Sequence, residues 1–537
     1  MKNAIKREPC KLVCRWPSVS ILCNKQTIIT ILLALAAVAA QAQEPFFCTD
    51  SAVVRGRIVD YSPVMGFQNL TAQVTDIFTG ELKTATAEIR EDGTFEKRLL
   101  LHHPILNWFY TSEIHISKQQ VPFYLCPGDT LDITICFHDG DVPDCRYRGG
   151  HSAEVARLLK VRNDYLSLQK LCRFFEGDIE AYNAFADSLY TTWQRKIGAI
   201  ADAHHFTSFE RRLAECDMAA VFGTAYLSYF SQIQDKMAQD DPAAPYTAGN
   251  AMMERISLPE IYPLLRRLPN NDSLMLAAKF FQWYLNGLEF SAPFRYPLFV
   301  KRGMAWGNSR DEVTEQLSLL RDTGRRLFAS ENDVLPIQLL QLHCINEAIG
   351  EWMEAGTAEE NFRSTRSFLT HPTLQRKAQQ IFDEQANMDS TLPLPEGDAA
   401  HFVKDILALY PGRYIVLDFW AMWCAPCKAE IRATKEFRHR LHEHSDVKFV
   451  FLANERNPNR EDYLAFVREN LEGEENIAID DNRFHQLQEL FGFNAIPFNV
   501  TLTPDGRIVR DGLLLRAAEA GFDRFILMLE EMKARLE

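Results

Sequence analysis

The spacing of hydrophobic and polar residues changes along the chain and sets apart a first region, residues 48–147. Here short runs alternate apolar and polar side chains, as at residues 84–89, and turn-forming residues such as 91–94 separate the runs. Such alternation is typical of strands that bury one face. Short strands at this spacing predict an antiparallel β sandwich.

Between residues 150 and 385 the apolar positions recur every three or four residues, which is the spacing of helices that bury one face. One such series is Tyr182, Phe185, Leu189, Trp193 and Ile197. The region is rich in aromatic residues, and its sequence shows no internal repeat. We expect a central all-α region of stacked helices around an aromatic core, rather than a cofactor pocket.

Residues 390–537 alternate between the two patterns. An apolar strand at 414–420 precedes a helix from 427 to about 442, and further strands and helices follow up to a final helix at 521–535. Alternating β and α elements predict an α/β fold around a central sheet. Residues 391–398 contain two prolines and a glycine, and we expect them to form a linker or a lead-in to this domain.

Residues 1–42 have the features of a signal peptide. Basic side chains precede an apolar stretch at 27–40, which runs into Ala40-Gln41-Ala42, an A-x-A cleavage pattern. The stretch is shorter than the ~20 residues of a membrane-spanning helix, so cleavage near Ala42 is favoured over an uncleaved anchor. We therefore expect an exported, periplasmic protein.

The 537-residue chain carries a formal net charge of −14. Because the predicted signal peptide is basic, the mature body is more acidic still. Such a body is a poor partner for nucleic acid or for an anionic membrane surface, and neither is expected to bind.

Two cysteines, Cys424 and Cys427, stand where the apolar strand gives way to helix-forming residues. Pro426 fits the first turn of a helix, because its missing N–H costs nothing there. Cys424 would then lie at a helix N-terminus, where free N–H groups and the macrodipole favour a thiolate. A thiolate is the attacking species in disulfide exchange, so the pair predicts a redox-active disulfide.

There are two alternative roles for these two cysteines. They could be two of the ligands of a zinc site, or they could serve packing only. A zinc site would need a second pair of ligands. The nearest histidines are His439, His442 and His444, at the end of the next predicted helix, and no cysteine follows Cys427. We therefore expect no metal at this motif.

Seven other cysteines would remain after cleavage of the signal peptide. They are Cys48, Cys126, Cys136, Cys145, Cys172, Cys216 and Cys344. Because their number is odd, at least one is expected to be free or intermolecular. Pairing among the first four is possible, and most of the seven could equally be small buried apolar side chains.

Residues 390–537 resemble a thioredoxin-fold module. Residues 418–427, Asp-Phe-Trp-Ala-Met-Trp-Cys-Ala-Pro-Cys, follow the thioredoxin active-site pattern, and Ile496-Pro497 stands where that family has its cis-proline loop. The export signal and an insertion after the second strand resemble the periplasmic thiol–disulfide interchange branch, the TlpA-like or ResA-like proteins. The β-rich region resembles a domain of unknown function that precedes such modules in envelope proteins.

The resemblance implies roles for individual residues. Cys424 would be the nucleophile, Cys427 the resolving thiol, and Asp418 the buried carboxylate that helps take the proton from the second cysteine. A merely hydrogen-bonded Asp418 is the alternative, although a carboxylate in an apolar strand is costly without a partner or a task. The residues expected to shape the substrate surface are Trp423, Ala425, Pro426, Ile496 and Pro497.

We therefore predict an exported thiol–disulfide oxidoreductase that needs no organic cofactor or metal. It would reduce disulfide-containing envelope proteins through a mixed disulfide, and the family implies a membrane thiol carrier as electron donor. The uncharged Ala425-Pro426 pair favours a reductant over an oxidant. Two alternatives are a thiol peroxidase related to the peroxiredoxins, and a binding protein whose thioredoxin module only docks partners.

Overall fold

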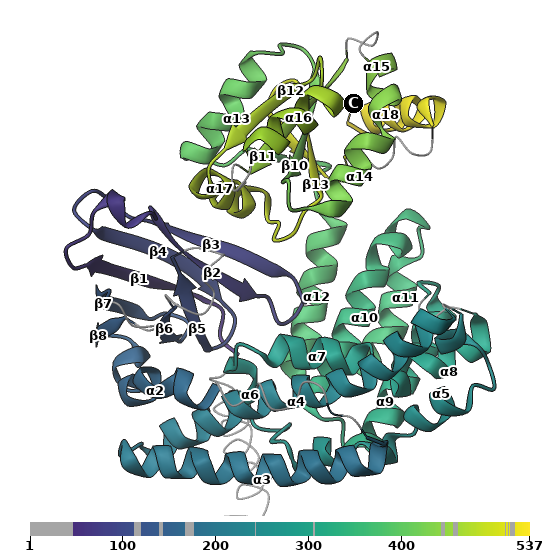
Figure 1. The fold of residues 1–537 in the computed structure, drawn as a ribbon. Coiled ribbons are helices and arrows are strands. Elements are labelled where there is room, and N and C mark those ends of the chain that lie inside the picture. Colours follow the sequence, from purple (N-terminus) through teal and green to yellow (C-terminus); the bar gives the residue numbers. More distant parts are fainter. Residues whose placement is uncertain are drawn as a thin grey trace, which may run out of the picture. The chain divides into compact units, whose positions relative to one another are not determined.

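The structure is a computed structural model (Figure 1). It describes residues 47–111, 120–138, 143–166, 175, 177–241, 243–303, 307–441, 446–454, 460–510, 512–513, 515 and 521–536. The predicted signal peptide and Cys172 lie outside these residues. Along the described ranges, no helix combines the length and apolar character that crossing a membrane requires.

The β-rich region contains two four-stranded sheets, with the strand orders β4-β1-β7-β8 and β3-β2-β5-β6. The strands are β1 (Asp50–Ile58), β2 (Asn69–Thr75), β3 (Leu82–Glu88), β4 (Thr94–Leu101), β5 (Ile105–Tyr110), β6 (Gln120–Leu125), β7 (Thr130–Cys136) and β8 (Asp144–Arg148). Apolar side chains from both sheets, such as Val54, Phe109 and Ile133, pack into one core. The alternating pattern of the sequence therefore has its cause in this one-sided burial.

One strand pair departs from the antiparallel arrangement that we predicted. β1 runs parallel to β7, with Val54 opposite Leu131, because the chain passes through strands of the other sheet before it returns. Gly56 lies in this pairing, and a Cβ atom there would come 2.4 Å from the carbonyl oxygen of Ile133. The close approach of the two strands thus depends on a residue without a side chain.

The middle region is helical, as predicted. Its α-helices are α2 (Ala156–Leu166), α3 (Ile179–Ala203), α4 (Ser208–Asp240), α5 (Ala251–Ile256), α6 (Leu274–Ala277), α7 (Phe281–Glu289), α8 (Ala292–Arg302), α9 (Arg310–Phe328), α10 (Leu335–Glu354), α11 (Ala358–Thr365) and α12 (Pro372–Ala386). The described residues also form the 3-10 helices η1 (Pro63–Met65), η2 (His151–Ala153), η4 (Ala244–Tyr246), η5 (Pro259–Ile261), η6 (Pro263–Arg267) and η7 (Arg366–Phe368). The expected aromatic core is present: the ring of Tyr182 stacks on those of Tyr226 and Tyr229.

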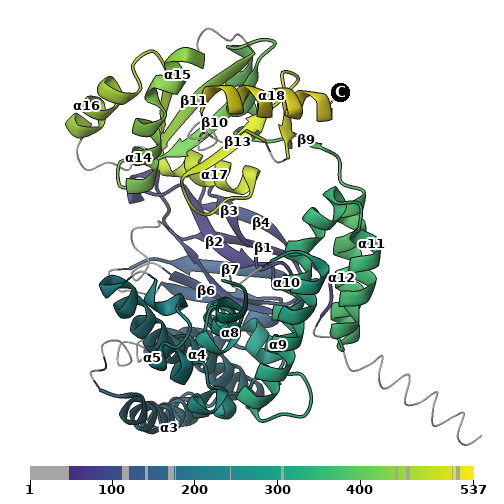
Figure 2. The same cartoon turned by 90° about the vertical axis from the view of Figure 1, so that its right-hand side faces the viewer.

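The C-terminal region is a six-stranded sheet in the order β12-β11-β10-β13-β14-β9, with helices on both faces (Figures 1 and 2). Its strands are β9 (Thr391–Pro393), β10 (Tyr414–Trp420), β11 (Val447–Asn454), β12 (Glu475–Ile479), β13 (Phe498–Leu502) and β14 (Arg507–Val509). Its helices are α13 (Asp398–Ala408), α14 (Ala425–Ala433), α15 (Lys435–Leu441), α16 (Arg460–Asn470), α17 (Asp481–Phe491) and α18 (Phe522–Leu536). This is the α/β architecture that the alternating pattern predicts.

Strand β10 is buried on both faces, which explains its nearly continuous apolar sequence. Val416 and Trp420 belong to the core that α14, α15, α16 and α18 cover. Ile415, Leu417 and Phe419 point to the opposite face, into a core shared with α13 and α17. β10 therefore anchors its carboxyl end, where the cysteine motif begins, between two packed layers.

Two predictions of local structure in this region need correction. Of the two alternatives for residues 391–393, a linker and a lead-in to the module, the linker is wrong, because these residues form the edge strand β9, which pairs antiparallel with β14. Proline is tolerated there because an edge strand can leave N–H positions unpaired. The predicted helix from residue 427 to about 442 begins earlier, at Ala425, and is interrupted at Thr434 between α14 and α15.

Candidate redox site

The two motif cysteines occupy the first turn of helix α14. Cys424 is the N-cap residue with an extended backbone, and its Sγ accepts a hydrogen bond from the N–H of Cys427 at 3.2 Å. Pro426 follows in the first turn, as the sequence predicts. The two sulfurs form a disulfide, with the Cα atoms 5.4 Å apart. The Cys424 sulfur therefore lies where helix N–H groups would stabilise negative charge once the disulfide opens.

The disulfide is nearly buried, whereas the residues around it are exposed. Cys424 and Cys427 are only 3% and 1% exposed, but Trp423 is 59% exposed. Ala425 and Pro426 are also exposed. The exposed side chains of Trp423, Ala425 and Pro426 therefore form the protein surface next to the disulfide. An exposed tryptophan next to a reactive sulfur is a feature of binding surfaces rather than of a core.

Residues distant in sequence complete the site because β10 and β13 are antiparallel neighbours. Phe419 near the end of β10 pairs with Phe498 at the start of β13. The loop before β13 thereby reaches the start of α14. The Ile496-Pro497 peptide bond in this loop is cis. The carbonyl oxygen of Ile496 lies 3.7 Å from the Sγ atom of Cys424.

Asp418 lies inside the module, on β10 and opposite Asn499 of β13. Its side chain is 2% exposed and accepts a hydrogen bond from the Asn499 amide. The amide oxygen of Asn499 in turn accepts a hydrogen bond from the N–H of Leu515 at 2.9 Å. Burial, helped by the nearby charge of Glu430, raises the pKa of Asp418 to about 7, against the lowering effects of the hydrogen bond from Asn499 and the charge of Arg438. A carboxyl group with this pKa can take up or release a proton near neutral pH.

Three further polar residues of the site were missed by the sequence reasoning. Asn499 is bound to Asp418, and Glu430 and Arg438 act on it electrostatically. Glu430 is buried in α14, one turn after Cys427. That spacing is visible in the sequence, since residues three apart share a helix face. Asn499 carried no such signal, because only strand pairing brings it to Asp418.

Arg438 is held inside the module by several bonds. Its side chain is 2% exposed, pairs with Glu474 at 3.2 Å, and donates to the carbonyl oxygens of Ile431 and Asn470. Burial lowers the pKa of Arg438. These contacts tie the end of α14 to the segment between α16 and β12.

None of the other cysteines that the structure describes takes part in this site. Among the residues that the structure describes, Cys48, Cys126, Cys136, Cys145, Cys216 and Cys344 are free thiols. The possible pairing among the first four is therefore not formed. Within the same described ranges, neither motif cysteine belongs to a group of metal-ligating side chains.

Comparisons with known proteins concern this region. Residues 412–508 match the thioredoxin-like family. No curated protein matches the chain. One similar solved structure is the thioredoxin domain of a thiol-disulfide oxidoreductase from Bacteroides vulgatus, with 18% identity over 23% of this chain and 82% of that chain, and a TM-score of 0.20.

Two other solved structures resemble the chain to a similar degree. StoA from Bacillus subtilis is 24% identical over 19% of this chain and 72% of its own, with a TM-score of 0.17. A DsbF homologue from Corynebacterium diphtheriae is 25% identical over 23% of this chain and 75% of its own, with a TM-score of 0.19. The family match and the disulfide at the start of α14 identify a thioredoxin-like thiol–disulfide module, preceded by a sheet region and a helical region.

Proposed function

We propose that the chain is an exported thiol–disulfide oxidoreductase that reduces disulfides in proteins of the cell envelope. One observation carries the proposal. The Cys424 sulfur caps helix α14, next to the carbonyl of Ile496 and beneath the surface around Trp423. This arrangement favours a thiolate and offers a partner chain both an apolar contact and backbone polar groups.

The reaction consists of two exchange steps. In the reduced protein the Cys424 thiolate attacks one sulfur of a substrate disulfide, and the other substrate sulfur leaves as a thiolate. Cys427 then loses its proton and attacks the Cys424 sulfur of the mixed disulfide, which releases the second substrate thiolate. The substrate gains two electrons and the Cys424–Cys427 disulfide closes. A dithiol donor, for which we propose a membrane thiol carrier, returns the two electrons by the reverse exchange.

Asp418 assists the second step. The Cys427 thiol must lose its proton before it can attack, and a carboxylate with a pKa of about 7 is suited to accept one near neutral pH. The bond from Asn499 holds this carboxylate in place. We therefore assign Asp418 the role of proton acceptor, with Asn499 as a positioning residue.

A Cys427→Ser variant tests the exchange mechanism. Without the resolving thiol, mixed disulfides on Cys424 should accumulate in cells and be released by a reducing agent. The double variant Cys424→Ser/Cys427→Ser is the control and should capture nothing covalently. A folded Cys427→Ser protein that forms no mixed disulfide would refute the mechanism. A double variant that still binds the same partners would indicate a docking protein instead.

Two further measurements test direction and location. A reduction potential near thioredoxin's, about −270 mV, supports a reductant, whereas one near about −120 mV would indicate an oxidant. Export predicts that the mature protein, isolated from the periplasm, begins close to Gln43, after cleavage at Ala42. An uncleaved chain confined to the cytoplasm would overturn the proposed location.

A further inference from the structure

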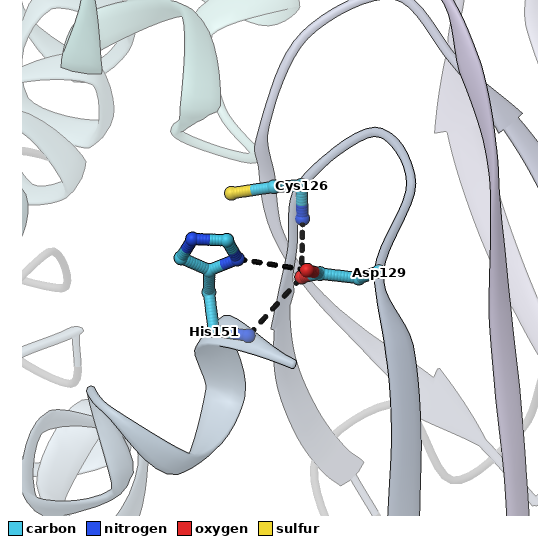
Figure 3. Close-up of side chains that lie close together, drawn as sticks. All are labelled: Cys126, Asp129 and His151. Carbon is cyan, nitrogen blue, oxygen red and sulfur yellow. Dashed lines mark hydrogen bonds and ion pairs between the residues drawn. The ribbon is translucent and has the colours of Figure 1, made fainter. Parts of the chain in front are cut away.

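A second cluster of reactive side chains lies in the β-rich region, at the turn between β6 and β7. Cys126 and Asp129 belong to this turn, and His151 begins η2. One ligand atom from each residue, the Cys126 sulfur, a carboxylate oxygen and a ring nitrogen, lie within 4.8 Å of one another. Figure 3 shows the Cys126 sulfur and the His151 ring on the same side of the Asp129 carboxylate. The three side chains thus converge on one point from two separate segments.

The carboxylate of Asp129 organises the cluster. Asp129 is 8% exposed. One of its oxygens accepts hydrogen bonds from the N–H groups of Cys126, at 2.8 Å, and His151, at 3.1 Å. The other oxygen lies 2.8 Å from Nδ1 of His151. The imidazole ring of His151 and the backbone of Cys126 are therefore held in position by the same carboxylate.

The segment that carries His151 is also held from its other side. Ser152 is completely buried, and its hydroxyl donates to the carbonyl oxygen of Tyr124 and accepts from the N–H of Tyr124. Gly150 has a φ of +57°, in the left-handed region, and a Cβ atom there would lie 3.5 Å from the Asp129 carboxylate. The backbone thus brings His151 to the turn through a conformation that favours glycine.

We propose that Cys126, Asp129 and His151 form a binding site for a borderline-soft divalent cation, with Zn²⁺ as the ion to test. Thiolate, imidazole and carboxylate are the ligands that zinc takes in proteins. Two ligand atoms of tetrahedral zinc lie about 3.5 Å apart, so the observed cluster needs only small side-chain movements to close on an ion. A fourth position would remain for water.

Binding replaces protons in a defined way. The ion takes the place of the hydrogen between Nδ1 of His151 and Asp129, and that hydrogen moves to the other ring nitrogen, Nε2. Among the described residues, Nε2 has no hydrogen-bond partner, and the His151 side chain is 46% exposed. The Cys126 thiol loses its proton to solvent as the metal–sulfur bond forms. One proton is therefore released for each ion bound.

The charges around Cys126 favour a cation over a nucleophilic role. Burial, together with the negative charges of Asp129 and Glu154, raises the pKa of the Cys126 thiol to about 12. A nucleophilic cysteine needs the opposite surroundings, which lower the pKa. A bound cation would favour the thiolate form of Cys126 and would itself be stabilised by the negative charges of Asp129 and Glu154.

Zinc titration of the full chain tests the proposal. The experiment uses the Cys424→Ser/Cys427→Ser background, because the reduced motif could itself bind zinc. We expect one Zn²⁺ per chain in competition with a chromophoric chelator, with one proton released. Co²⁺ in place of Zn²⁺ should show a thiolate-to-metal charge-transfer band. Cys126→Ser should remove that band, and Cys126→Ser and His151→Ala should each weaken binding by at least about tenfold.

Cys145→Ser is the matched control, since Cys145 is another partly buried free thiol of the same region and lies outside the cluster. It should leave affinity and spectrum unchanged. His151→Ala removes a side chain that is 46% exposed, so it is the variant expected to disturb folding least. A background chain that binds no Zn²⁺, or that binds it equally after Cys126→Ser and His151→Ala, would overturn the proposal. Neither outcome would affect the redox function proposed for Cys424.

Discussion

Asp418→Asn removes a carboxyl group from the interior of the redox module and should change how stability depends on pH. The pKa of Asp418 is raised from 3.8 to about 7 in the folded protein, mainly by burial. Below pH 4 the carboxyl group is neutral in both the folded and the unfolded state and does not lower the free energy of unfolding. Between pH 4 and pH 7 the unfolded chain releases the proton while the folded chain keeps it, so stability falls as pH rises. Above pH 7 the carboxyl group is ionised in both states, and its effect on the free energy of unfolding no longer changes with pH.

The size of the effect follows from the shift. One pKa unit corresponds to about 1.4 kcal/mol, so a shift of about three units lowers the free energy of unfolding by about 4 kcal/mol above pH 7. Asn has nearly the same shape and can still accept the hydrogen bond from Asn499, but it does not ionise. The free energy of unfolding of the variant, relative to that of the wild type, should therefore rise by about 4 kcal/mol between pH 4 and pH 8.

Hydrogen exchange of the β10 amides, corrected for intrinsic rates at each pH, measures this difference within the full chain. Asp405→Asn, an exposed position on α13 of the same module, is the control and should follow the wild-type curve. The rate of disulfide exchange should also lose an ionisation near pH 7 in Asp418→Asn. Parallel stability curves for wild type and Asp418→Asn from pH 4 to pH 8 would refute a neutral, buried Asp418.

Two other substitutions test the packing of the chain. Arg438→Met should lower the free energy of unfolding of the redox module by about 3 kcal/mol, because it removes the buried ion pair between Arg438 and Glu474. Hydrogen exchange of the β10 amides measures this loss, and a loss below about 1 kcal/mol would contradict the prediction. Gly56→Ala should destabilise the β-rich region by about 1–3 kcal/mol, since its methyl group would press on the Ile133 carbonyl. Gly350→Ala, within α10 and with open space around it, should instead stabilise by about 0.5–1 kcal/mol; thermal unfolding separates the two, and equal shifts would show that the contact at Gly56 does not matter.

Much of the redox module could be predicted from local patterns. β10 is recognisable because both of its faces are buried, and the motif is recognisable because Pro426 and Cys424 suit a helix start. Strand β9 was missed because its residues, with two prolines nearby, have no strand pattern of their own. Its pairing with β14 supplies the missing stabilisation, and such pairing is invisible to a local reading.

By itself, the sequence determined the three kinds of structure in this chain and the chemistry of its cysteine motif. The periodicity of apolar residues indicates which faces of a helix or strand are buried, and the spacing of residues along a helix indicates which side chains lie on the same turn. Only the tertiary structure decided which residues meet across long stretches of chain: Ile496 beside Cys424, Asn499 on Asp418, and His151 with Cys126. The order of the strands and the paths of the loops determine these contacts, and neither can be inferred from the periodicity of the residues concerned.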